Sequence, residues 1–430
     1  MTGKAPALVI MTGLKMIIRH LRLVEYAREL DVVPIMVFSA GGDLKRLREL
    51  TGQPDHPLSG LGELWPVPDS TVGGVLGSVQ DLLERYDVRG VLSCGEYFVE
   101  PAAALADVLG LPGPGWSAAA SSRNKLLQRY ALPDHSPGWR VIHPSARSSV
   151  AGLELPWNGP LVVKPVGRMS SSGVRQLASA ADLAAAVGGY PADETLLIEQ
   201  RVVGAEFSVE SLVQGGEPRW SGITGKSTNE DGGGTFVEMS HTIPPVGLPA
   251  ADAAELTKVN AEVLRRLEVR DAITHAEYRV GDRGVTLMEV ALRVPGDGIS
   301  VLWHLATGAS MEERIVDLAI GRDVSYPEPV RRGRHVYLDH PHGTLVDVRA
   351  DGTPVSWTTR DERWPRLHAT DRDAPPRSCA VLVSKVPGDE LGTIADSDAR
   401  SASVLVDAPL DADIDEVTAA ACDGVEIIVG

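Results

Sequence analysis

Cysteine is scarce in this chain. The 430 residues contain three cysteines, Cys94, Cys379 and Cys422, and these lie far apart in the sequence. An odd number of isolated cysteines excludes a disulfide framework, and the lack of any CxxC pair argues against a structural zinc site. Such cysteine usage is typical of a reducing compartment, so we expect a cytoplasmic protein.

Long apolar runs are also missing. A membrane-spanning helix needs about 18 or more consecutive apolar residues, and no stretch of the sequence approaches that length. The first residues, MTGKAPALVIMTG, lack the apolar region and the cleavage pattern of a secretory leader. We therefore expect no membrane partner and no signal peptide.

Basic residues are fewer than acidic ones. The chain has 41 lysines and arginines against 58 acidic residues, which gives a formal net charge of −17. Nucleic-acid binding requires a basic surface, so nucleic acid is excluded as the main partner, although a local basic pocket remains compatible with one nucleotide. The length and the hydrophobic content of 43% suit a globular chain of roughly three domains.

The N-terminal part alternates strand-like and helix-like segments. ALVIMTG and VVPIMVFSA are short apolar runs on either side of a helical pattern, and residues 88–110 repeat the theme. Alternating β and α elements predict an α/β unit with a parallel sheet that is covered on both faces. No GxGxxG follows the first strand, which argues against dinucleotide binding. We interpret residues 1–112 as a structural α/β domain.

A short basic helix is expected after Pro112. The segment begins at a cap-like Ser117 and carries Arg123, Lys125 and Arg129. A basic turn of this kind is usually a solvated helix face. The next apolar strand, at 161–165, contains Lys164 and leads into a loop of glycine and serine. A phosphate is a good partner for a lysine in a buried strand, and the loop's N–H groups could close over phosphates, but GxxxxGK[ST] is absent.

Two further segments carry spaced acidic residues. Glu199 and Glu206 lie on strand-like runs on either side of Gly204, where they suit an adenine amino group and ribose hydroxyls, or equally well solvated strand edges. The glycine-rich stretch Gly232–Gly234 precedes a strand-like run with Glu238 and His241. A long glycine-rich loop inside a compact domain is usually functional or disordered.

The segment 275–293 predicts a β-hairpin with a charged face. A three-residue loop, Asp282–Gly284, would set Glu277 directly opposite Glu289. Opposed carboxylates repel, and a divalent cation such as Mg²⁺ removes that penalty, whereas the alternative is an ordinary solvated sheet face. Alternation places His275, Glu277, Arg279, Glu289 and Arg293 on the charged face. It places Ala276, Tyr278, Val280, Thr286, Met288, Val290, Leu292 and Val294 toward the core.

The order of these motifs resembles the ATP-grasp superfamily of carboxylate–amine ligases over roughly residues 90–320. The motifs are Asn124-Lys125, VVKP with its Gly/Ser loop, IEQRVVGAE, VEMSH and the hairpin. The VExxH element and the mostly β last hundred residues are most similar to the L-amino-acid ligase (dipeptide synthetase) branch. The resemblance implies an ATP-grasp fold of class α/β. It has an N-terminal doubly wound domain (1–112), a central ATP-binding α+β core (113–326) and a mostly β C-terminal unit (327–430).

The resemblance also implies a role for each motif residue. Glu277 and Glu289 would bind Mg²⁺, with Mn²⁺ as a substitute, and Arg293 would stabilise an acyl phosphate beside the substrate-side pair Glu238 and His241. ATP would be held by Lys125, Lys164, Ser170, Ser171, Ser172, Gly173, Glu199, Arg201, Val202 and Glu206.

One position departs from the family pattern. The family usually reads Glu-x-Asn-x-Arg on the second hairpin strand, with Asn as a third metal ligand, and here that position is Ala291. In the expected register Ala291 faces His275, so His275 or a water could fill the gap. The change could also weaken a second metal or mark a subfamily variant.

The resemblance predicts a reaction with small-molecule partners. A substrate carboxylate, expected to be an amino acid, attacks the γ-phosphate of ATP, and an amine then displaces phosphate from the acyl phosphate to form an amide. The alternatives are an ATP-dependent carboxylase of the same superfamily and a non-catalytic ATP-binding regulator. The identity of the acid and the amine stays open, and a homodimer is the default expectation for the assembly.

Overall fold

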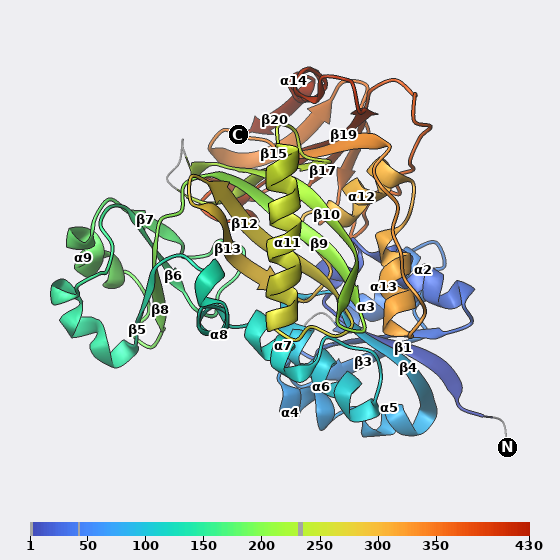
Figure 1. The fold of residues 1–430 in the computed structure, drawn as a ribbon. Helices are drawn as coiled ribbons and strands as arrows, with labels where there is room; N and C mark the ends of the chain where they lie inside the picture. Colours follow the sequence, from blue (N-terminus) through green and yellow to red (C-terminus); the bar gives the residue numbers. More distant parts are fainter. Residues whose placement is uncertain (1–2, 42–43, 231–234) are drawn as a thin grey trace.

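The computed structural model describes residues 3–41, 44–230 and 235–430 (Figure 1). The predicted glycine loop Gly232–Gly234 lies outside the described residues. Within the described part, no helix is both long and apolar enough to cross a membrane.

The N-terminal part folds around a four-stranded parallel sheet in the order β3-β2-β1-β4. Alternate residues of β1 enter two different cores: Leu8 and Ile10 pack on one face, and Ala7 and Val9 on the other. Burial on both faces explains why the strand is a continuous apolar run, and it confirms the predicted doubly wound α/β arrangement. The elements are β1 (Ala5–Met11), α1 (Leu14–Ile17), α2 (Leu21–Glu29), β2 (Val33–Ser39), α3 (Leu44–Thr51), β3 (Glu63–Val67), α4 (Val72–Leu76), α5 (Gln80–Arg85), β4 (Tyr86–Ser93) and α6 (Val99–Leu109).

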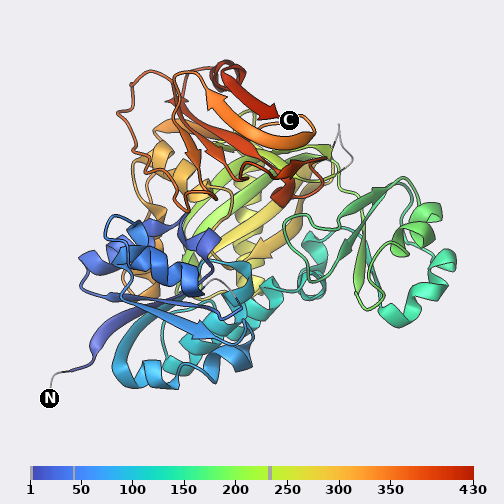
Figure 2. The same cartoon turned by 180° about the vertical axis from the view of Figure 1, so that it is seen from behind.

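A small antiparallel sheet stands out to one side of the molecule in both views (Figures 1 and 2). Its strand order is β5-β8-β6-β7, and it has its own core, which includes Ile142, Leu161 and Ile198. Two short helices lead into it from the N-terminal part. The elements are α7 (Trp116–Ser122), α8 (Lys125–Ala131), β5 (Trp139–Ile142), β6 (Leu161–Pro165), β7 (Arg175–Leu177), α9 (Leu183–Val187) and β8 (Leu196–Gln200).

A nine-stranded sheet forms the centre of the molecule, in the order β13-β12-β9-β10-β11-β14-β19-β17-β16. The long helix α11 covers one face, where Leu256 and Val263 pack against Val209 and Ala276 (Figure 1). Because side chains alternate along a strand, the neighbouring residues of β9 and β12 face the other side. The elements are β9 (Ala205–Gln214), β10 (Glu217–Thr228), β11 (Glu238–Ile243), α11 (Ala250–Arg266), β12 (Ala272–Gly281), β13 (Gly284–Ala291), α12 (Ile299–Thr307) and α13 (Met311–Ala319).

The C-terminal part continues this sheet instead of starting a new one. Strand β11 pairs with β14, which pairs with β19. A small second sheet in the order β18-β15-β20 packs over the same core, so the part is mostly β, as predicted. The elements are β14 (Arg331–Tyr337), β15 (Gly343–Ala350), β16 (Val355–Trp357), β17 (Arg377–Val383), β18 (Glu390–Leu391), β19 (Ala402–Pro409), α14 (Ile414–Asp423) and β20 (Val425–Val429).

The β12–β13 hairpin has the predicted central register but a different turn. Glu277 pairs with Glu289, and His275 pairs with Ala291, as the sequence predicted. The loop is shorter than the three residues expected, because Gly281 pairs directly with Gly284. An irregularity at Met288 adds one residue to β13 and restores the register toward the glutamates.

The extra residue at Met288 is a β-bulge, and it reverses which side chains of β13 face the core between the bulge and the turn. Thr286 and Met288 were predicted to face the core, and that prediction is wrong. Leu287 enters the core under α11 with no exposed surface, and Met288 is half-buried. An extra residue in one strand shifts every side chain beyond it to the opposite face, and no sequence alternation signals where it occurs.

Candidate active site

Charged side chains from five neighbouring strands meet on the sheet face opposite α11. Glu289 comes from β13, Glu277 from β12, Glu206 from β9, Lys226 from β10 and Glu238 from β11. The alternate positions of β9 and β12 pack under α11, which fixes this orientation. The predicted metal, ribose and substrate residues therefore share one surface.

Lys125 links the hairpin to the Gly/Ser loop. Asn124 caps α8 by accepting from the N–H groups of Leu126 and Leu127, which fixes Lys125 in the first turn. The Lys125 ammonium donates to the carbonyl of Arg168 at 2.8 Å and to the Glu289 carboxylate at 3.0 Å. The side chain is buried, so this lysine joins a predicted metal ligand to the start of the predicted phosphate loop.

Lys164 and Glu199, which the sequence assigned to phosphate and adenine, contact one another on adjacent strands of the small sheet. The Lys164 ammonium lies 2.7 Å from Glu199 Oε2, and Arg129 Nε donates to Oε1 at 2.5 Å. Burial would raise the pKa of Glu199, but the two cations lower it to about 2. Burial also lowers the pKa of Lys164, and Glu199 opposes that shift. The site holds a fixed carboxylate beside a lysine.

Arg129 was expected on a solvated helix face, but it is buried. A solvated basic helix face was expected for α8, yet the Arg129 side chain has no exposed surface and also donates to the carbonyl of Met288. The helix docks this face against β13 and the small sheet, and the buried guanidinium is paired with Glu199. Arginine is suited to this because its planar fork satisfies several acceptors at once.

The predicted ribose residue lies in a second buried ion-pair group. Arg279 Nε and Nη2 donate to Glu206 Oε2 at 3.1 and 2.9 Å, and Arg279 also binds Glu230. Arg201 donates to Glu230 at 2.7 Å, and the carbonyl of Val202 accepts from Arg279 at 3.0 Å. Arg201 and Val202, predicted to line the adenine edge, are thus linked to Glu206 through Glu230 and Arg279.

The Gly/Ser loop adopts a constrained conformation. Ser170 and Ser171 both have φ of 57°, and Gly173 has φ of 74°. Left-handed backbone at serine is unfavourable, by about 1 kcal/mol or more for each residue, unless neighbours hold it. The Ser171 hydroxyl donates to the carbonyl of Phe236 at 2.8 Å, and the N–H of Ser172 donates to the carbonyl of Met169 at 3.1 Å. The first contact joins the loop to the segment just before β11, and the second closes a turn within the loop.

Glu277 and Glu289 offer a suitable ligand pair for a divalent cation. They are directly opposed across the strands, and their side chains keep 23% and 28% exposure, so both are accessible. Glu277 Oε1 accepts from Lys226 and His275, whereas Oε2 receives no hydrogen bond from the described residues. Hard carboxylate oxygens in this arrangement suit Mg²⁺.

His275 supports Glu277 from behind. Its Nε2 lies 3.2 Å from Glu277 Oε1, and its Nδ1 lies 2.8 Å from Glu210 Oε1. Glu210 is fully buried and also accepts from Ser208, Thr224 and Trp303. Burial would lower the pKa of His275, but the two carboxylates raise it to about 9. The side chain opposite Ala291 therefore contacts a predicted metal ligand through one ring nitrogen and a buried carboxylate through the other.

Arg293 depends on a glutamate that the sequence reasoning missed. Glu96, from the loop after β4, accepts from Arg293 Nε at 2.5 Å and from Arg123 at 2.6 Å. Burial would raise the pKa of Glu96, but the two guanidinium groups lower it. The N-terminal sheet thereby orients the predicted acyl-phosphate residue, and no local sequence signal marks a contact of this separation.

His241 and Glu238 lie on β11 but in different environments. The His241 side chain is almost fully buried, and its Nε2 lies 3.2 Å from Asp297 Oδ2. Arg400, from just before β19, binds the same carboxylate at 2.7 and 2.9 Å and lies 3.7 Å above the ring of Tyr337. Asp297 and Arg400 were missed by sequence reasoning, and together they tie the C-terminal part to the predicted substrate strand.

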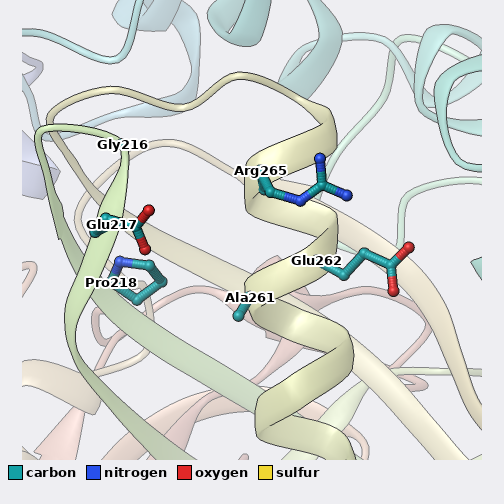
Figure 3. A pocket seen from close by; sticks show the side chains of 6 residues that line it. All are labelled: Gly216, Glu217, Pro218, Ala261, Glu262 and Arg265. Atoms are coloured by element: carbon teal, nitrogen blue, oxygen red, sulfur yellow. The ribbon is translucent and has the colours of Figure 1, made fainter.

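Two surface hollows lie away from this group. One, of about 290 Å³, lies between the β9–β10 turn and α11 (Figure 3). The other, of about 680 Å³, shares Gly216 and Arg265 with it and extends to Trp116. None of the predicted site residues lines either hollow. The candidate site is therefore defined by its side-chain cluster.

Comparison with known proteins identifies the same fold. The ATP-grasp domain family matches residues 157–301. An L-arginine-specific L-amino acid ligase of Bacillus subtilis is 24% identical over 276 residues, which are 61% of this chain and 63% of that protein. The D-alanine–D-alanine ligase A of Chromobacterium violaceum is 27% identical over 285 residues, 61% of this chain and 69% of that enzyme.

A solved structure extends the likeness to the whole chain. The L-amino acid ligase from Bacillus licheniformis superposes with a TM-score of 0.75 at 18% identity and covers 100% of both chains. At that identity the likeness concerns the fold, including the C-terminal part. The alignment with the first sequence relative spans a little under two thirds of that relative's length. The motif order, the sheet and these matches agree: residues 157–301 match the ATP-grasp domain family, and the chain has the ATP-grasp fold.

Proposed function

We propose that this protein is an ATP-dependent ligase that joins the carboxylate of an amino acid to an amine, through an acyl phosphate, with release of ADP and phosphate. The observation that carries the proposal is the Lys125 bridge, which connects Glu289 of the opposed pair to the start of the Gly/Ser loop. Residues suited to terminal phosphates and to a divalent cation are thus contiguous. The similarity to two ligases supports the same conclusion.

The nucleotide is proposed to lie between the small antiparallel sheet and the nine-stranded sheet. Lys125 and Lys164 would neutralise its phosphates, and Glu199, Glu206 and the Arg201–Val202 backbone would hold its base and ribose. Mg²⁺ bound by Glu277 and Glu289 would withdraw charge from the terminal phosphates. The loop Ser170–Gly173, held against Phe236, would exclude water from the acyl phosphate.

The substrate carboxylate is proposed to meet Arg293. Arg293 Nε donates to Glu96 and Nη1 donates to the carbonyl of Val294, so among the described residues Nη2 is the group available to the oxygens that gain charge as the acyl phosphate forms. Glu238 is the more exposed member of the β11 pair, at 16% against 2% for the His241 side chain. We therefore assign Glu238 to the amine, and we assign His241 to positioning β11 through Asp297.

The first experiment is a release assay over pairs of amino acids with ATP and Mg²⁺, in which ADP and phosphate are measured and amides are identified by mass. L-Arginine should be tried first, because the similar Bacillus subtilis enzyme is named for it. One amide per ADP supports the proposal. AMP with pyrophosphate would contradict the acyl-phosphate route. ADP release that needs bicarbonate and yields no amide would instead establish a carboxylase, and ATP binding without turnover would establish a regulator.

A further inference from the structure

Lys226 lies at the centre of the acidic cluster. Its ammonium is 2.6 Å from Glu277 Oε1, 3.2 Å from Glu238 Oε1 and 3.3 Å from Glu206 Oε1. The side chain is 1% exposed, so these contacts are shielded from solvent. The ammonium donates hydrogen bonds to Glu277 and Glu238 and forms an ion pair with Glu206, and these three carboxylates come from three different strands.

The three carboxylates repel one another, and a cation among them offsets that cost. Oxygens of Glu206, Glu238 and Glu277 all lie within 4.8 Å of one another, a spacing that would suit a metal ion. Like charges at this distance in a buried position repel strongly. The Lys226 ammonium lies within 3.3 Å of all three carboxylates and supplies the positive charge among them.

We propose that Lys226 is a built-in cation, a positioning residue that holds Glu206, Glu238 and Glu277 together and keeps a divalent cation out of this triad. A metal ion then binds on the other side of Glu277, between Glu277 and Glu289. This inference rests on the proposed function only in assigning Glu277 and Glu289 to the metal.

Each carboxylate of the triad has a second holder. Glu206 Oε2 accepts from Arg279, Glu277 Oε1 accepts from His275, and Glu238 Oε2 lies 3.4 Å from the hydroxyl of Ser397. Removing the ammonium therefore leaves the three carboxylates near their positions but without the one cation that all three share. A neutral residue at position 226 should convert the triad into a divalent-cation site.

The test is Mn²⁺ binding to the full chain without nucleotide, followed by electron paramagnetic resonance. Lys226→Met should bind one Mn²⁺ more than the wild type does. The affinity of this additional site should exceed any binding of Mn²⁺ to the wild-type triad by at least about tenfold. The gain should be lost in the double variant Lys226→Met/Glu238→Gln and absent from Lys226→Arg, which keeps the charge. Circular dichroism checks that each variant is folded. A folded Lys226→Met protein with wild-type Mn²⁺ affinity would overturn the proposal.

A second measurement needs no change at Lys226. In the wild-type background with a non-hydrolysable ATP analogue, Glu289→Gln should weaken Mn²⁺ binding about tenfold or more, whereas Glu238→Gln should change it less than about twofold. A loss at Glu238 equal to that at Glu289 would place the metal in the triad and contradict the proposal. Both measurements are independent of turnover, so they can succeed or fail separately from the ligase reaction.

Discussion

The two charged groups of the candidate site are built in different ways. The Lys164–Glu199–Arg129 group is almost fully buried, and two of its members come from hydrogen-bonded neighbours in one small sheet. The hairpin group around Glu277 and Glu289 keeps partial exposure and draws its partners from remote elements. The first group is therefore expected to act mainly on stability and nucleotide position, and the second mainly on turnover.

The sharpest test of this contrast is Glu289→Gln. The loss of a predicted metal ligand should lower turnover by about 100- to 1,000-fold, because charge near the transferring phosphate is no longer neutralised. The free energy of unfolding should fall by less than about 1 kcal/mol, since the Lys125 pair is partly exposed. Steady-state kinetics and urea unfolding measure the two effects. A large loss of stability with retained turnover would show that Glu289 acts on folding and not on catalysis.

Arg129→Met should show the opposite balance. The variant leaves a buried carboxylate with one cation instead of two, and we expect a loss of about 3 kcal/mol in the free energy of unfolding. Arg140→Met is the matched control, because Arg140 is exposed and, within the described part of the chain, donates only to the carbonyl of Trp139. It should change stability by less than about 0.5 kcal/mol. Equal stability of both variants would show that the buried pair is not a structural requirement.

Glu96→Gln tests the reach of the N-terminal sheet into the hairpin group. Without the charged partner, Arg293 should lose its fixed orientation, and kcat should fall about tenfold. The affinity for ATP should stay near that of the wild type, because Glu96 contacts none of the predicted nucleotide residues. Equilibrium binding of an ATP analogue provides that readout. A parallel loss of nucleotide affinity would mean that Glu96 supports the whole site.

The smallest expected effect is a pH dependence from Glu199. Its folded-state pKa of about 2 lies below the unfolded value of 4.5, so its stabilising contribution is present above pH 4.5 and is lost as the pH falls toward 2. The free energy of unfolding should therefore fall less steeply across pH 4.5–2 in Glu199→Gln than in the wild type. Parallel curves for the two proteins would contradict the buried pairing.

Much of the fold could be predicted from the sequence, because period and turn residues are local signals. The parallel N-terminal sheet followed from the alternation of strands and helices, and the opposition of Glu277 and Glu289 followed from the register that a turn was expected to set. The bulge at Met288 could not be predicted, since the register toward the glutamates was right only because a shorter turn and an extra residue cancel.

The partners of the site residues were largely beyond sequence reasoning. Arg293 and Glu96 are 197 positions apart, and Arg400 and Asp297 are 103 apart, so their contacts arise from how separate sheets dock. Lys226 was marked locally in the sequence, because it is the one charged residue in GITGKST, a segment of mostly small residues. The same argument that identified Lys164 would have identified it, because a lysine in a buried strand needs anionic partners.

The central claim is that an acyl phosphate forms between a substrate carboxylate and the γ-phosphate. Its most direct test uses ¹⁸O in the carboxylate of the amino acid that supports ADP release, together with ATP, Mg²⁺ and the amine. A carboxylate oxygen attacks phosphorus and stays with it when the amine displaces the phosphate, so the account predicts one ¹⁸O atom in the released phosphate for each amide formed. Unlabelled phosphate, or label in AMP, would contradict it.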